Sequence, residues 1–156
     1  MVLYHGSNVA IERIDLAKSR PYKDFGRAFY LSSSEEQARE MARFKTLTFG
    51  GEEVVTAFEV EDYSMYNVLS FDGYTEEWAE FVYRNRDERR PFQHPYDVVF
   101  GPIANDTVGV QIRDLRERKI SMARFLENLK YHKGITFQYA FCTLRAIENL
   151  LSNEGK

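Results

Sequence analysis

Three short segments of the sequence carry residue types that suit the binding of a flat, polar ligand. The first is Tyr4-His5-Gly6-Ser7, in which a histidine stands beside a glycine at the end of an expected strand. Because glycine has no side chain, a planar ligand can approach its backbone closely. A turn that carries a surface histidine explains the same residues, so this segment alone does not define a site.

The other two segments lie in expected strands. In the segment from Phe25 to Ser33, Tyr30 can present its ring to a cleft, or it can be one exposed aromatic on a core strand. In the segment from Thr136 to Phe141, side chains alternate between two faces. Three aromatic residues mark one face as the core side, and Gln138 lies on the opposite, smaller and more polar face, as expected for a cleft wall. A glutamine that faces solvent is an equally good interpretation.

The elements that must position these residues alternate irregularly along the chain. Strands are expected over 2–5, 28–31, 54–60, 96–100 and 135–141. Apolar periodicity and capping residues predict four helices. The first follows Ser34, which matches a capping box with Gln37, and this helix places Ala38, Met41, Ala42 and Lys45 on one face. The others follow Thr75, span 122–129, and follow Thr143, the last one including Leu150 and Leu151. Gly101-Pro102 is expected to end the fourth strand. Without a regular βαβ repeat, this order favours an α+β fold.

Composition limits the classes of protein that fit. The 156 residues are expected to form a single domain over 1–156, with 44% hydrophobic residues and a net charge of −3. Cys142 is the only cysteine, so no internal disulfide is possible, and it is interpreted as a small buried residue. The three histidines have no metal-ligand spacing, so no metal is expected. No apolar run is long enough for a membrane span, and we expect a soluble, cytoplasmic protein. The arginines of the densest basic stretch are interpreted as a solvated helix end or loop: Arg84, Arg86, Arg89 and Arg90.

Taken in order, the three segments resemble the NAD+ site of the ADP-ribosyltransferase superfamily. More narrowly, the chain resembles a small bacterial branch of uncharacterised transferase-like proteins, through residues 3–7, 19–31, 96–106 and 138–143. The resemblance implies a split β-sheet core with flanking helices around an NAD+ cleft, in which strands near both termini border the cleft. His5, Tyr30 and Gln138 are then expected to line the same pocket.

The resemblance also implies a role for each matching position. His5 would form a hydrogen bond with the adenine-side ribose, and the backbone of Gly6, beside Ser7, would pair with the nicotinamide carboxamide. Tyr30 would stack on the nicotinamide ring. Arg20, in the loop expected to cover the ligand, would meet the pyrophosphate as a cation.

Two positions depart from the superfamily pattern. Met41 stands where a second stacking aromatic is often found, and an adaptable thioether can still cover a ring. Gln138 stands where the superfamily usually has a catalytic glutamate. A glutamine accepts a bond from a ribose hydroxyl but brings no charge to the cationic transition state. This difference favours mono-transfer or NAD+ hydrolysis over polymer synthesis.

The resemblance therefore implies an active mono-ADP-ribosyltransferase, of the kind found as a toxin with a small antitoxin partner or as a phage-defence effector. The alternatives are a catalytically inactive module that binds NAD+, ADP-ribose or a protein on the same frame, and a structural domain with a relict cleft. The acceptor of ADP-ribose could be a protein, a nucleic acid or a small molecule. The mildly negative net charge argues against a nucleic acid, because phosphate contacts need clustered lysine and arginine. A local basic rim is still compatible with this net charge.

Overall fold

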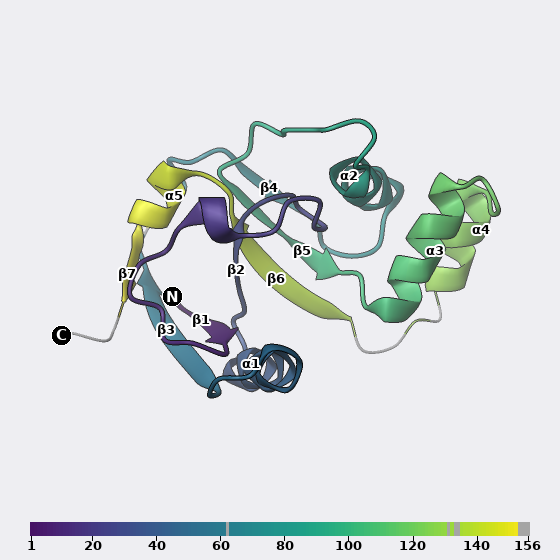
Figure 1. Ribbon diagram of the computed structural model, residues 1–156. Helices are drawn as coiled ribbons and strands as arrows, with labels where there is room; N and C mark the ends of the chain where they lie inside the picture. The colour runs from purple at the N-terminus through teal and green to yellow at the C-terminus, as the bar shows by residue number, and fades with distance from the viewer. Residues whose placement is uncertain (62, 131, 133–134, 153–156) are drawn as a thin grey trace.

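The computed structural model describes residues 1–61, 63–130, 132 and 135–152. Over these residues the chain forms a mixed α+β fold, which confirms the expected fold class (Figure 1). The first sheet has the strand order β1 (Val2–Ser7), β3 (Val54–Val60), β7 (Leu150–Ser152). The second has the order β2 (Phe29–Leu31), β6 (Thr136–Phe141), β5 (Val98–Ile103), β4 (Val68–Ser70). The helices are η1 (a 3-10 helix, Leu16–Lys18), α1 (Glu35–Phe49), α2 (Glu76–Arg86), α3 (Asp106–Arg116), α4 (Met122–Leu129) and α5 (Leu144–Glu148).

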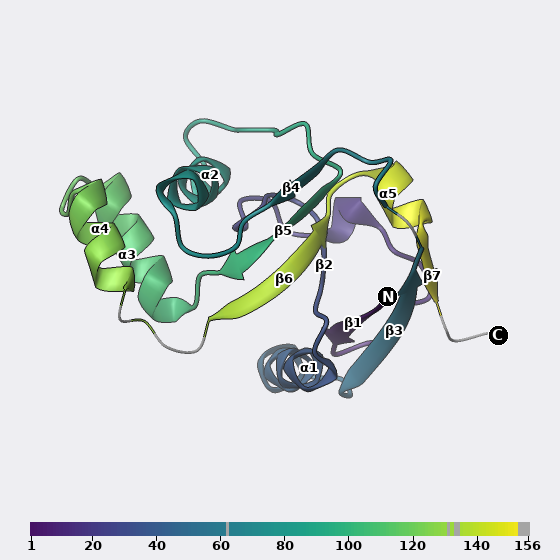
Figure 2. The same ribbon diagram turned by 180° about the vertical axis from the view of Figure 1, so that it is seen from behind.

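The two sheets meet where β1 and β2 approach each other. Tyr4 and Ser32 exchange both backbone hydrogen bonds, with N···O distances of 2.7 and 2.8 Å. In both views β2 runs from the four-stranded sheet down to β1, and α1 continues from there below the junction (Figures 1 and 2). The first strand of the chain is thus joined directly to the sheet that contains β6, far along the sequence.

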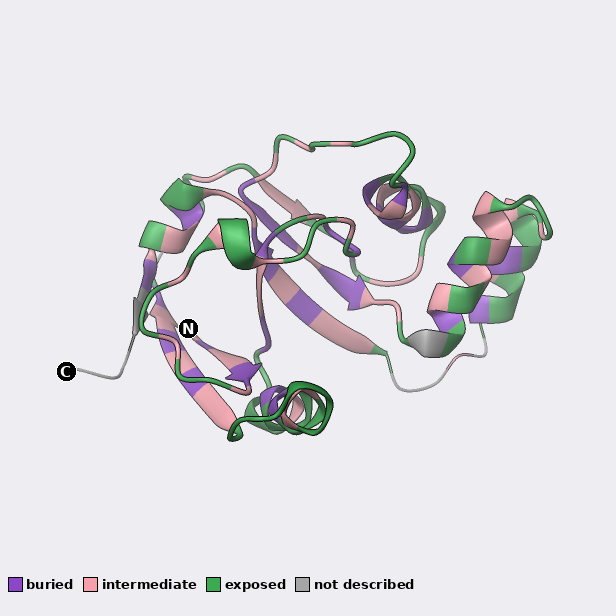
Figure 3. Ribbon diagram, viewed as in Figure 1, coloured by how far each residue is buried: buried purple, intermediate pink, exposed green. Residues whose placement is uncertain are grey.

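Two clusters of buried side chains hold these layers together. One contains Phe25, Trp78, Val99 and Phe125, and it joins one face of the four-stranded sheet to α2, α3 and α4. The other lies between the two sheets and includes Leu3, Leu31, Phe58 and Phe141. The strands are mostly buried or half-buried, whereas α1 exposes most of its surface (Figure 3). None of the described helices has the length and apolar character needed to cross a bilayer.

The helix caps follow the sequence closely. Ser34, Thr75 and Thr143 each accept a hydrogen bond from the backbone N–H three residues later, as predicted. A capping box also needs a hydrogen bond from the Gln37 side chain back to the backbone N–H of Ser34. This bond is not formed, so that half of the prediction is wrong. The Gln37 side chain accepts a bond from the hydroxyl of Ser32 (2.8 Å) and does not return to its own helix cap. This bond connects the start of α1 to the end of β2.

Strand β5 continues through Gly101 and Pro102, so the prediction that this pair ends the strand is wrong. The carbonyl of Phe100 accepts a bond from Phe71, on the β4 side of β5. Because the N–H and C=O groups of alternate residues point to the same side of a strand, the nitrogen of Pro102 also faces the β4 side. It lies beyond the end of β4, so the missing N–H of proline costs no hydrogen bond between strands.

Other elements also differ from the sequence expectations. Strand β1 continues through Gly6 to Ser7, beyond the expected range 2–5, and η1 was not predicted. Residues 150–152 form β7 on the edge of β3 and are not part of the last helix, which ends at Glu148. Strand β4 and helix α3 were not predicted. Helix α3 begins at an Asn105 cap, and its signal was the spacing of Val108, Ile112 and Leu115 along one helical face.

Candidate functional site

His5 lies at the junction of the two sheets as a neutral imidazole. Its Nδ1 is 2.8 Å from the backbone carbonyl oxygen of Tyr30, and its ring stacks on Phe29 with centroids 4.2 Å apart. Since a carbonyl can only accept, Nδ1 carries the proton, and Nε2 is left as an acceptor. Burial, and after it the positive charge of Lys45, lower the pKa of His5 to about 4. His5 can therefore accept a bond from a ligand hydroxyl at neutral pH.

Gly6 presents its backbone at the edge of β1 that faces away from β3. The N–H and C=O of Tyr4 point to Ser32 across the junction, and alternation along the strand directs those of Gly6 to the same side. The carbonyl of Gly6 accepts a hydrogen bond from Nζ of Lys45 (2.9 Å). A Cβ atom at Gly6 would overlap the backbone carbonyl of Ala38, so close packing of α1 requires a glycine here. The sequence interpretation explained the glycine only by the close approach of a ligand.

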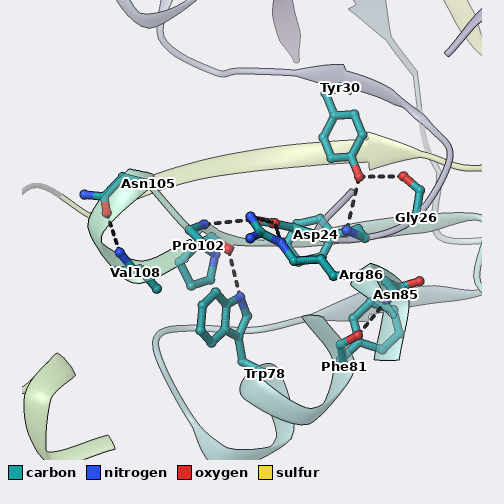
Figure 4. Close-up of polar contacts among 12 residues, drawn as sticks. Asp24, Gly26, Tyr30, Trp78, Phe81, Asn85, Arg86, Pro102, Asn105 and Val108 are labelled. Atoms are coloured by element: carbon teal, nitrogen blue, oxygen red, sulfur yellow. Dashed lines mark hydrogen bonds and ion pairs between the residues drawn. The ribbon is translucent and has the colours of Figure 1, made fainter. Parts of the chain in front are cut away.

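The Tyr30 side chain connects β2 to the preceding loop by hydrogen bonds. Its hydroxyl donates to the carbonyl of Gly26 (2.8 Å) and accepts from the N–H of Phe25 (3.1 Å), as Figure 4 shows. Burial raises the pKa of this hydroxyl well above its usual value. The Nζ atom of Lys23 lies 5.0 Å from the centroid of the Tyr30 ring. A ligand that stacks on this ring has to share it with, or displace, the lysine.

Gln138 shares a sheet face with Tyr30 but is buried. Tyr30 pairs with Ala140 across β2 and β6, and Gln138 stands two residues before Ala140 on the same side of β6. Its side chain is opposite Gly101, over which Phe25 and Phe71 pack. Gln138 is 9% exposed and Ala140 is fully buried. The interpretation of this face as an open cleft wall is therefore wrong for this structure, because the loop before β2 covers it.

Three cations surround the junction of His5, Gly6 and Tyr30, and two of them were not predicted as site residues. Lys45 reaches it from α1, Lys23 lies in the loop before β2, and the guanidinium of Arg20 lies 5.5 Å from the Phe49 ring centroid. Burial and Lys23 together lower the pKa of Lys45 to about 8. Burial and Arg20 lower the pKa of Lys23. The sequence signal for Lys45 was its place among alanines on the inner face of a helix.

The remaining predicted binding residues have smaller structural roles. Met41 is exposed on α1, one helical turn before Lys45 and so on the same flank as that lysine. Ser7 is buried, and its hydroxyl accepts a bond from the N–H of Val9 (3.3 Å). The structure thus joins His5, Gly6 and Tyr30 through direct contacts with each other and with lysines. It keeps Gln138 buried on the neighbouring strand β6, opposite Gly101.

A buried ion pair lies on the other side of Tyr30 and was missed by the sequence analysis. One carboxylate oxygen of Asp24 accepts from Nε of Arg86 (2.7 Å), and the other accepts from the N–H of Ala104 (2.7 Å) (Figure 4). Asp24 is 4% exposed. The interpretation of Arg86 as part of a solvated basic stretch is therefore wrong, since its charge holds the loop before β2 against the helical layer.

Other candidate groups offer no chemistry. Burial raises the pKa of the half-buried Cys142 thiol to about 12, which suits a packing role and not a nucleophile. Within the part of the chain that the structure describes, no group of histidines, cysteines and carboxylates has the geometry of a metal site. A cavity of about 350 Å³ lies between α2, α3 and α4, and one of about 450 Å³ lies between the start of α1 and the start of β6. Neither is lined by His5, Tyr30 or Gln138.

Comparison with known proteins places the chain in a family without a known activity. The family model described as "Protein of unknown function (DUF3990)" matches residues 1–151. No curated protein and no solved structure matches the chain. Because the family model spans nearly all of the sequence, the chain belongs to the DUF3990 family.

Proposed function

We propose that this chain is a mono-ADP-ribosyltransferase with an ADP-ribosyltransferase-like split-sheet fold, which binds NAD+ at the junction of its two sheets. The observation that carries the proposal is the meeting of His5, the edge backbone of Gly6 and Tyr30 beside lysines that form no ion pair among the described residues. These groups come from β1, β2, α1 and one loop, and their types match the parts of a dinucleotide.

Each part of NAD+ finds complementary chemistry there. The edge N–H and C=O of Gly6 form a donor and acceptor pair, which is the complement of a carboxamide. The Nε2 acceptor of His5 suits a ribose hydroxyl. The aromatic ring of Tyr30 offers a stacking surface for nicotinamide, and the positive charges of Arg20 and its two lysine neighbours suit the pyrophosphate.

The proposed reaction breaks the bond between the nicotinamide nitrogen and C1′ of the ribose. The bonding electrons leave with nicotinamide, and a nucleophilic atom of the acceptor attacks C1′ and loses its proton. Gln138 would hold a hydroxyl of the reacting ribose. Since Phe25 covers this side of the sheet, the proposal requires the segment around Phe25 to shift when NAD+ binds.

Incubation of the purified protein with NAD+ labelled in the adenosine half tests this proposal. We expect release of free nicotinamide, with label on a protein acceptor or as free ADP-ribose. His5→Ala should weaken NAD+ binding, because it removes a ribose partner. Gln138→Ala should reduce turnover far more than NAD+ affinity, because its bond matters most as the ribose becomes cationic.

A second candidate function is a module that binds NAD+ or ADP-ribose without turnover. The favouring observation is that Gln138 is uncharged and 9% exposed. A hydrogen bond to a charged group contributes about 1.5–3 kcal/mol, against about 0.5–1.5 kcal/mol for a neutral one. If the wild type binds NAD+ but releases no nicotinamide, and Gln138→Glu releases it, the natural chain is a binder on a transferase frame.

We also propose that the activity serves a bacterial toxin or phage-defence effector, controlled by a small antitoxin protein. Only the resemblance of the sequence to transferase-like toxins supports this role. Controlled expression in bacteria tests it: the wild type should arrest growth, and His5→Ala should relieve the arrest. Equal growth with both chains at equal protein levels would contradict the toxin role but not the proposed chemistry.

A further inference from the structure

We propose that Lys23 and Lys45 form a diphosphate-binding site in which Lys45 exchanges its bond to the Gly6 carbonyl for a bond to the anion. Binding of the diphosphate would then free the Gly6 carbonyl to accept a hydrogen bond from a carboxamide. This inference adds to the proposed NAD+ site a coupling between its diphosphate and carboxamide positions, so its biological meaning rests on the proposed function. The anion site itself can be measured without any catalysis.

The two lysines lack the partners that ordinarily accompany charges at partly buried positions. Among the described residues, neither forms an ion pair. The charge of Asp24 raises the pKa of Lys23, but this carboxylate is already engaged by Arg86 and by the N–H of Ala104. Removal of an ammonium from water is costly unless an opposite charge compensates it. The pair is therefore suited to an anionic ligand.

The contacts that do hold the two ammonium groups are weak and neutral. Lys45 donates to one backbone carbonyl, and Lys23 lies over one aromatic ring. Lys23 lies close enough to Lys45 for its charge to lower the pKa of Lys45. Two like charges held near one another favour a ligand with at least two negative charges. A diphosphate supplies these, and Arg20 adds a third cation at the rim.

The coupling follows from the position of the Gly6 carbonyl. It lies on the strand edge that faces the junction, and Lys45 already uses it at 2.9 Å. A carboxamide N–H₂ that donates to this oxygen competes with the lysine. A diphosphate that draws the ammonium away removes the competition, so anion and carboxamide should bind with positive cooperativity.

Calorimetry with inorganic diphosphate tests the anion site directly. We expect wild-type protein to bind it, and Lys23→Met and Lys45→Met each to weaken binding by roughly tenfold or more, the effect of one lost charge-assisted hydrogen bond. Lys119→Met is the matched control, since it removes an equal charge from an exposed lysine that pairs with Glu117. Absence of diphosphate binding, or equal binding by the folded Lys23→Met and Lys45→Met variants, would overturn the site.

Titration with free nicotinamide tests the coupling. Saturating diphosphate should strengthen nicotinamide binding to the wild type, and Lys45→Met should bind nicotinamide more tightly than the wild type without diphosphate. Equal nicotinamide affinity in all three states would refute the exchange at Gly6. If diphosphate binds as expected but NAD+ is neither bound nor cleaved, the anion site stands and the proposed function fails. If NAD+ is cleaved and both methionine variants keep the wild-type KM, the function stands and the anion site fails.

Discussion

Two charged clusters lie on either side of Tyr30 and are built from neighbouring residues of the same loop. Asp24 is buried and satisfied, with Arg86 on one carboxylate oxygen and the N–H of Ala104 on the other. Lys23 precedes it in sequence and points over the Tyr30 ring, and neither Lys23 nor Lys45 forms an ion pair among the described residues. The first cluster is complete without a ligand, whereas the second is not.

This difference separates charges that hold the fold from charges that are available for function. The Asp24 pair fixes the loop to β5 and α2, and thereby holds Phe25 over the sheet. Lys45 joins α1 to β1 by a single hydrogen bond to a neutral carbonyl, and the lysine cluster keeps its positive charge beside His5 and Gly6 without an ion pair among the described residues. We therefore expect substitutions in the first cluster to affect stability and substitutions in the second to affect ligand binding.

The largest effect is expected at Asp24. Asp24→Asn keeps the shape of the side chain but leaves the guanidinium of Arg86 without its counter-ion in a largely buried position. We expect a loss of about 3 kcal/mol in the free energy of unfolding, measured by urea denaturation.

The control for this experiment is Glu35→Gln, which breaks the exposed pair with Arg39. Exposed pairs contribute about 0–1 kcal/mol, so this change should be small. Comparable losses in the two variants would show that the Asp24 cluster is not a structural clamp, and the contrast between the clusters would fail.

Substitution of Tyr30 should affect both regions. Tyr30→Ala is expected to weaken NAD+ binding by roughly tenfold or more, because stacking of a base on an aromatic ring contributes about 1–3 kcal/mol. Tyr30→Phe keeps the ring and should bind NAD+ nearly as the wild type. It nevertheless removes the bonds to Gly26 and Phe25, so its unfolding free energy should fall by about 1 kcal/mol or more. Unchanged NAD+ affinity of a folded Tyr30→Ala protein in calorimetry would count against the stacked pose.

A smaller effect is expected from pH. The pKa of Lys45 is lowered to about 8, so this lysine loses its charge as pH rises through 8, and affinity for an anion should fall by about tenfold between pH 7 and pH 9. His5 from β1 stays neutral over this range because its pKa is about 4. ADP affinity measured across this range should show the drop, and Lys45→Met should flatten it. An equal slope in both proteins would assign the pH dependence to other groups.

Much of the fold could be predicted from local sequence, because caps and apolar spacing act within a few residues. Ser34, Thr75 and Thr143 were identified as helix caps in this way. Elements that depend on tertiary pairing were not. The apolar pair Leu150-Leu151 is too short to distinguish a strand from a helix, and the pairing of residues 150–152 with the edge of β3 decides between them.

The meeting of the first two segments could be predicted from the sequence, whereas the role of the site stays a prediction. The backbone at His5 and Gly6 meets Tyr30 as the order of the segments implied, although which side of β6 is covered depends on how Phe25 folds over it. The unpaired state of Lys45 is a property of what is absent around it in space. No spacing in the sequence predicts that Lys45 has no counter-ion nearby, although the helical pattern did predict that Lys45 lies on the inner face of α1.

Nicotinamide release measures most directly whether this chain cleaves NAD+ at the junction of its two sheets, as we propose. With NAD+ and a lysate as the source of acceptors, we expect the wild type to release nicotinamide and His5→Ala to release much less. Gln138→Glu should raise the rate of hydrolysis, since it introduces the charge that the glutamine lacks. If NAD+ binds but neither the wild type nor a folded Gln138→Glu protein releases nicotinamide, the catalytic account of this site is contradicted.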